Sequence, residues 1–163
     1  MRLFAAFIIA AAAALAATPA YAQSGWGMSE PVAGRVGELS PLSPTHRYWD
    51  ACRSNDVEAA ARACGRVIGA RVSRVHTGSA HYFRAIALAS LGDSEEALRD
   101  LRRAYGIFAQ TLDAEEDNAN ALYGRGLTLI RMGYGADGEA DIARAVALSG
   151  GRAGQFFDVS SQD

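Results

Sequence analysis

The stretch that decides the fold is HYFRAIALASLGDSEEALRDLRRA, residues 81–104. Its apolar residues recur every three or four positions, in two runs, and this is the spacing of amphipathic helices. Gly92 and Asp93 stand between the runs, a glycine that can end one helix and an aspartate that can cap the next. The stretch therefore predicts a helical hairpin, with one helix over 81–91 and a second from 95 to about 112.

The same spacing of small and apolar residues recurs twice more along the chain. In the hairpin over 81–112 these residues are Ala85, Ala97, Leu101 and Ala104, separated by twelve, four and three positions. Two other sets have the same spacing, namely Gly126, Gly138, Ile142 and Ala145, and Tyr48, Ala60, Cys64 and Val67. Three units in one register predict a repeat array of helical hairpins, since no single hairpin buries its own apolar face.

The predicted fold class is all-α, because no segment alternates apolar and polar residues as a strand does. The three units are expected over 45–68, 79–112 and 119–148, and residues 69–78 are expected to connect the first two. A short tail helix is expected over 152–157, within the tail 152–163. Its two phenylalanines, Phe156 and Phe157, are expected to cover the open end of the array.

This pattern resembles the tetratricopeptide repeat (TPR) family. The resemblance rests on residues 82–88 with 92–104 and on residues 122–145, and it covers 45 to about 148. It implies a right-handed α-solenoid of about three hairpins whose concave groove binds a peptide.

The sequence departs from the family at several points. Tyr48 is bulky where a small residue is usual. Gly138 stands where alanine is usual, and this replacement lowers helix stability by about 1 kcal/mol. Ala85 and Gly126 are 41 residues apart, whereas the family repeats every 34. We expect the extra residues around 106–117, as about two helical turns that project beyond the hairpin.

The N-terminus has the features of a secretory signal peptide. Arg2 precedes an uncharged apolar run over 3–17, and Ala20-Tyr21-Ala22 provides small residues for cleavage. The run falls short of the roughly 20 residues that a spanning helix needs, so no membrane insertion is expected after cleavage. We expect a signal peptide over 1–22, a flexible lead over 23–44, and export to the periplasm or the extracellular space.

The two cysteines are expected to form a disulfide after export. Cys52 and Cys64 are twelve residues apart, which is about 18 Å on one straight helix, far beyond the reach of a disulfide. The bridge therefore needs a chain reversal, and the turn-forming residues 54–56 can provide it. A redox pair is the alternative, but there is no C-x-x-C. The histidines do not have the spacing of zinc ligands, so no metal site is expected.

Composition and motifs favour binding over catalysis. The 163-residue chain has 16 basic and 18 acidic residues, so no nucleic-acid partner is expected. Residues 133–138 match G-x-G-x-x-G, but a predicted helix precedes them, so we expect a turn and no cofactor. No acid is placed in the sequence to orient His76 or His81, and no enzyme activity is expected. The arginines of the fourth helix are expected to face solvent, with docking of an acidic partner as the alternative.

The candidate binding face lies on the first helix of each of the last two hairpins. At 100° per residue, residues four apart share this face. The predicted partner-binding residues are Tyr82, Ile86, Asn120, Tyr123, Leu127 and Arg131. Apolar anchors beside an arginine suit a protein or peptide segment, so we expect an interaction module, that is, a scaffold, adaptor or assembly factor. A small-molecule or lipid carrier using the same groove is the alternative, as is simple packing of the tyrosines between units.

Overall fold

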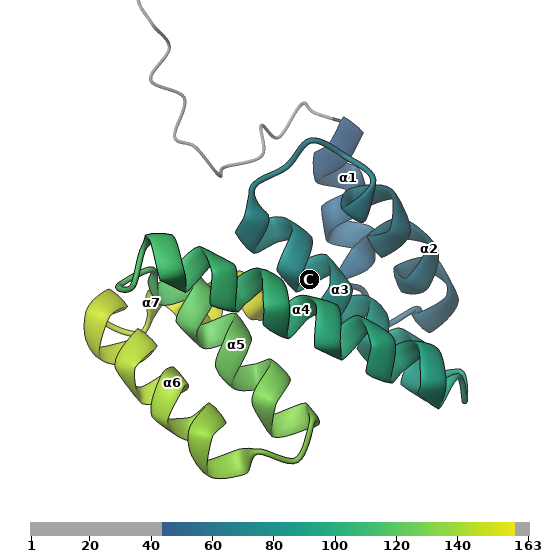
Figure 1. Ribbon diagram of the computed structural model, residues 1–163. Helices are drawn as coiled ribbons and strands as arrows, with labels where there is room; N and C mark the ends of the chain where they lie inside the picture. The colour runs from purple at the N-terminus through teal and green to yellow at the C-terminus, as the bar shows by residue number, and fades with distance from the viewer. Residues whose placement is uncertain (1–43, 159–163) are drawn as a thin grey trace, which may run out of the picture. The chain divides into compact units, whose positions relative to one another are not determined.

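Seven helices make up residues 44–158, the part of the chain that the computed structural model describes (Figure 1). They are α1 (Pro44–Cys52), α2 (Val57–Ile68), α3 (Arg74–Ser90), α4 (Ser94–Ala114), α5 (Ala119–Arg131), α6 (Gly135–Ser149) and α7 (Arg152–Phe157). No strand occurs within these residues, so the predicted all-α class is confirmed. The predicted signal peptide (1–22) and nearly all of the predicted lead segment lie outside the described residues.

Consecutive helices pack against one another from α1 through α6 (Figure 1). The most extensive contacts join α3 to α4 and α5 to α6, and each of these pairs is a predicted hairpin. Asp56 and Asn118 are the N-caps of α2 and α5, and their side chains accept hydrogen bonds from the backbone N–H groups of Ala59 and Ala121 at 2.9 and 3.0 Å. Asp93, the predicted cap of α4, stands at the N-cap position but its side chain makes no capping hydrogen bond.

The first hairpin, α1–α2, contains the predicted disulfide. Cys52 ends α1, the chain reverses through residues 53–56, and Cys64 lies on α2 with its Cα 4.6 Å from that of Cys52. Both cysteines are buried beside Trp49 and Val67. The bridge therefore joins the two helices within the core.

Helix α3 begins earlier than predicted, at Arg74, with Ser73 as its N-cap. The prediction of a connection over 69–78 is therefore wrong for its second half. Gly78 was expected at the end of this connection, but it lies inside α3, where the ring of Phe108 packs directly against the backbone. A Cβ at position 78 would stand 2.9 Å from Phe108 Cε1. Close packing, and not a turn, requires this glycine.

Helix α4 contains the extra residues of the 41-residue step. The predicted extension around 106–117 is confirmed, since α4 continues to Ala114. The expectation that it projects beyond the hairpin is wrong, because Phe108, Thr111 and Leu112 are all buried. Since α3 also starts one turn early, Phe108 lies between Gly78 of α3 and Gly124 of α5.

Helices α5 and α6 approach each other through two glycines. A Cβ on Gly126 would stand 2.6 Å from the carbonyl oxygen of Gly138. Gly138 thus permits a close backbone contact between the two helices, which offsets its low helix propensity. The sequence 133–138 forms the turn between the two helices and the first turn of α6, as predicted.

Helix α7 folds back onto the earlier helices. Gly150 and Gly151 both adopt the left-handed conformation, with φ of 61° and 86°, and so reverse the chain after α6. The expectation that Phe156 and Phe157 cover the open end of the array is wrong. Phe156 contacts Trp49 of α1, with ring centroids 5.2 Å apart, and Phe157 is buried among aromatic residues of α3, α4 and α5.

Candidate functional site

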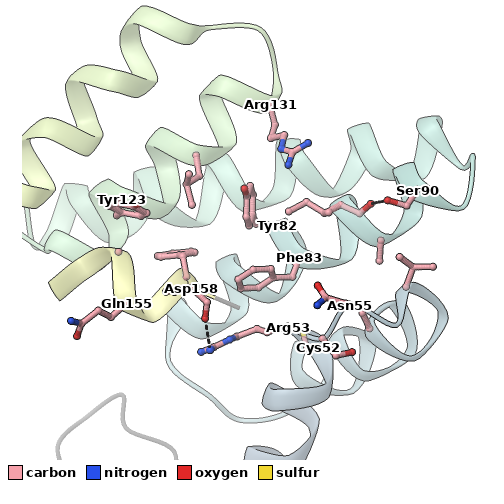
Figure 2. Close-up of a pocket in the computed structure, with 18 of the residues that line it drawn as sticks. Cys52, Arg53, Asn55, Tyr82, Phe83, Ser90, Tyr123, Arg131, Gln155 and Asp158 are labelled. Carbon is pink, nitrogen blue, oxygen red and sulfur yellow. Dashed lines mark hydrogen bonds between the residues drawn. The ribbon is translucent and has the colours of Figure 1, made fainter. Parts of the chain in front are cut away.

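A cavity of about 760 Å³ opens between the α1–α2 turn, α2, α3, α5 and α7 (Figure 2). We call it the cleft. Tyr82, Phe83, Ile86 and Ser90 line it from α3, and Tyr123, Leu127 and Arg131 line it from α5. Val57 and Ala60 of α2 and Phe157 of α7 close its other sides. The wall is therefore apolar for the most part, with polar groups at the edges.

The 41-residue repeat places equivalent residues of α3 and α5 side by side in the cleft. Tyr82 corresponds to Tyr123, Ile86 to Leu127, and Ser90 to Arg131. Each helix exposes every fourth residue on this side, which is the expected helical period. Five of the six predicted binding residues thus lie in one cavity.

Asn120 is the predicted residue that lies elsewhere. It lines a second, more polar cavity together with Asn118, Arg152 and Gln155. Helix α7 contributes residues to both cavities and so separates Asn120 from the cleft. Helical spacing on α5 could not reveal this, because α7 comes from a distant part of the sequence.

One end of the cleft, which we call the aromatic end, is filled by the chain's own Phe157. The ring of Phe157 stacks on Tyr123, with centroids 5.5 Å apart and planes at 27°. Tyr82 and Phe83 meet the same ring at centroid distances of 6.3 and 6.1 Å. The two predicted tyrosine anchors therefore pack within the protein, against α7, at this end of the cleft.

The other end of the cleft is not covered by α7, and we call it the open end. Ile86 and Leu127, one helical turn after Tyr82 and Tyr123, supply its apolar lining. Arg131 lies beside the Tyr82 hydroxyl (Figure 2). Burial raises the pKa of Tyr82, and the hydrogen bond and charge of Arg131 oppose this rise. Arg131 is exposed and forms no ion pair with any carboxylate among residues 44–158. A positive charge beside an apolar wall is suited to a carboxylate carried on an apolar segment.

Arg53 holds α7 to the first hairpin. Its guanidinium donates to the backbone carbonyl of Phe156 at 3.3 Å and to that of Asp158 at 2.7 Å (Figure 2). The same group lies over the Trp49 ring at 5.5 Å. Burial lowers the pKa of Arg53, while the charges of Asp50 and Asp158 oppose this. Sequence reasoning missed this contact, which spans more than 100 residues and has no local signal.

His81 belongs to a buried polar network outside the cleft lining. Its Nδ1 lies 2.9 Å from Asp100 Oδ1, and Arg84 donates to both Asp100 oxygens at 2.6 and 2.8 Å. Burial raises the pKa of Asp100, but the hydrogen bonds of Arg84 and His81 outweigh it and lower the pKa to about 2. The expectation that no acid orients His81 is wrong, because the acid comes from the neighbouring helix.

An equivalent ion pair occurs one repeat later, so the pair is a repeated contact between the two helices of a hairpin. Arg125 donates to both oxygens of Asp141, also at 2.6 and 2.8 Å. Both residues lie 41 positions after their counterparts, whereas position 122, which corresponds to His81, is a leucine. Because the pair forms without a histidine in α5–α6, we interpret the Asp100 network as a structural link between α3 and α4.

His76 is a packing residue. It lies against Trp49 at 4.9 Å and Phe156 at 5.0 Å, measured between ring centroids, and its Nδ1 is 2.8 Å from Ser73 Oγ. Burial and the nearby charge of Arg53 lower its pKa to about 4, so the imidazole is neutral at pH 7. In the described part of the chain no three His, Cys, Asp or Glu side chains are grouped to hold a metal ion.

Comparisons add no relative to this description. No protein-family model matches the sequence, and no curated protein matches it significantly. The likeness to TPR proteins therefore rests on the residues alone. Within residues 44–158, no helix is both long and apolar enough to cross a bilayer.

Proposed function

We propose that this chain is an exported protein-interaction module, a scaffold, adaptor or assembly factor, that binds a protein or peptide segment in the cleft. The observation that carries the proposal is the open end, where Ile86 and Leu127 adjoin Arg131, which has no carboxylate partner within residues 44–158. Apolar pockets supply affinity in such complexes, and a guanidinium orients a carboxylate or a backbone carbonyl.

A TPR-like array of three hairpins is part of this proposal. It is supported by the register of Ala85 with Gly126 and by the two Arg–Asp pairs that repeat at the same interval. In such an array the cleft corresponds to the concave groove that the resemblance implies. Export is supported by the signal-like residues 1–22, and the Cys52–Cys64 bridge agrees with it, since disulfides persist in oxidising compartments.

A small-molecule or lipid carrier is the second candidate. A volume of about 760 Å³ falls within the range of ordinary ligand cavities. A carrier predicts that the purified protein retains an organic molecule. Solvent extraction followed by mass spectrometry detects it.

The test of the interaction proposal is a comparison of three baits. Wild type, Arg131→Glu and the control Arg102→Glu are tagged and used for affinity purification from the envelope fraction of the source cells. Arg102 is exposed on α4 and does not line the cleft, so the control makes the same charge change elsewhere. Tyr123 is avoided because its substitution would disturb α7.

A partner that uses the open end is retained by wild type and Arg102→Glu and lost by Arg131→Glu. Charge reversal replaces an attraction by a repulsion, and we expect an affinity loss of at least about tenfold. The same proteins captured by all three baits would contradict the proposal, and so would a partner lost only by Arg102→Glu, since that partner would dock on the arginines of α4. A retained lipid with no captured protein would favour the carrier.

A further inference from the structure

Helix α7 is joined to the rest of the fold by a segment of two glycines, which we call the joint. Gly150 and Gly151 are the two residues between α6 and α7, and a Cβ at either would meet nothing within 4 Å. With six residues, α7 is far too short to be stable as an isolated helix in water. Its conformation therefore depends on its contacts in the cleft.

Those contacts have the character of a peptide in a binding site. A single side chain, Phe157, enters a slot whose aromatic walls come from three helices: Tyr82, Phe83, Phe108 and Tyr123. Arg53 holds the backbone on either side through the carbonyls of Phe156 and Asp158. Any peptide offers such carbonyls, whereas the fit of the Phe157 ring between the aromatic walls is specific to that side chain.

The open end continues from this slot without being used by α7. It presents Ile86, Leu127 and Arg131, whereas the described chain ends at Asp158, beside Arg53 (Figure 2). A partner that fills the slot and also reaches Arg131 with a carboxylate makes a contact that α7 does not make. This additional contact offsets part of the association entropy that a separate molecule loses and the tethered α7 does not.

We propose that α7 is an internal ligand of the cleft, and that the partner is a peptide segment carrying an aromatic side chain and a carboxylate, which displaces α7 from the slot. This inference rests on the proposed function and names the chemistry of the partner. Displacement lowers the apparent affinity of the partner, since only chains with α7 undocked can bind it. The joint at Gly150 and Gly151 lets α7 move away while the hairpins stay intact.

The test uses a synthetic, fluorescently labelled peptide with the sequence of residues 152–158, RAGQFFD, which has both an aromatic side chain and carboxylates. Binding to the full chain is measured by fluorescence anisotropy. In the Phe157→Ala variant the slot is empty and Arg53 is unchanged, so we expect the peptide to bind at least about tenfold more tightly than to wild type. The peptide RAGQFAD, which lacks the decisive ring, is the control and should not bind either protein.

A second variant keeps the test decisive if Phe157→Ala does not fold. Gly151→Ala leaves the slot and Arg53 intact but strains the left-handed joint, so it favours the undocked state and should tighten peptide binding by about fivefold. Equal affinity for wild type and both variants, or equal binding of RAGQFFD and RAGQFAD, would overturn the proposal.

The outcome is distinguishable from that of the proposed function. Suppose that Arg131→Glu loses a captured partner but Phe157→Ala does not bind the peptide more tightly. This result would support the interaction module and overturn the displacement of α7. The partner would then lie beside α7, in the open end alone. Peptide binding to Phe157→Ala without any captured partner would support the slot and count against the interaction module.

Discussion

Replacing Gly126 by alanine tests the contact between α5 and α6. The new Cβ would stand 2.6 Å from Gly138 O and 2.7 Å from Ile142 Cγ1. Carbon–oxygen contacts are normally about 3.3 Å or longer, so the helices must separate by several tenths of an ångström. Gly138 presents a backbone carbonyl, which cannot turn aside as a flexible side chain can.

Two opposing effects determine the result. Alanine is favoured over glycine inside a helix by about 1 kcal/mol. Overpacking a tight contact destabilises by roughly 1–3 kcal/mol, and a rigid backbone neighbour places this site in the upper part of that range. We therefore expect Gly126→Ala to lower the free energy of unfolding by about 1–2 kcal/mol.

Gly106→Ala is the matched control. Gly106 lies inside α4, and a Cβ there would meet no atom within 4 Å. Only the helix preference acts, so this variant should raise the free energy of unfolding by about 1 kcal/mol. Urea unfolding followed by circular dichroism at 222 nm measures both variants. If Gly126→Ala stabilises the protein as Gly106→Ala does, the close approach of α5 and α6 is refuted.

Three further predictions concern stability. Replacing Cys52 and Cys64 by serine should lower the free energy of unfolding by about 3 kcal/mol, the loop-closure value for their separation of 12, and a urea titration showing a loss below 1 kcal/mol would contradict it. The pKa of Asp100 is lowered from 3.8 to about 2. Ionised Asp100 therefore contributes about 2 kcal/mol to the free energy of unfolding above pH 4, and this contribution is lost as the pH falls toward 2. Acid titrations should show this loss in wild type but not in Asp100→Asn, which is destabilised already at pH 7. The pKa of His76 is lowered from 6.5 to about 4, so stability is complete above pH 6.5 and falls by about 3 kcal/mol down to pH 4; equal pH profiles for wild type and His76→Phe would refute the cause.

The hairpins could be predicted because their signals are local. The turn at Gly92, the cap at Asp56 and the twelve-residue spacing of the small residues each act over one or two helical turns. The disulfide followed from the same reasoning, since the distance between Cys52 and Cys64 demands a reversal and the intervening residues favour one. Helical period then placed five of six candidate residues on one side of α3 and α5.

Glycines were the least reliable guide. The sequence predicts Gly78 within a connection, but it lies inside α3, and Gly138 lies within a helix as predicted, where its spacing alone indicates only a loss of helix propensity. Each is required by a neighbour that presses on the backbone, Phe108 in one case and Gly126 in the other. The sequence shows that a side chain is missing, but whether the reason is a turn or a close contact depends on residues that are distant along the chain.

Local signals predict the helices, the three hairpins, the disulfide, and the repeated face with apolar residues and Arg131. Which groups meet across elements depends on the tertiary structure. His81 meets Asp100 at a separation of 19 residues, and Arg53 meets α7 at a separation of more than 100. Helix formation and capping depend on neighbours within a few residues, whereas docking of α7 depends on the burial of Phe157 among side chains of three distant helices. That docking turned a predicted open groove into a cleft with one end filled by the chain itself.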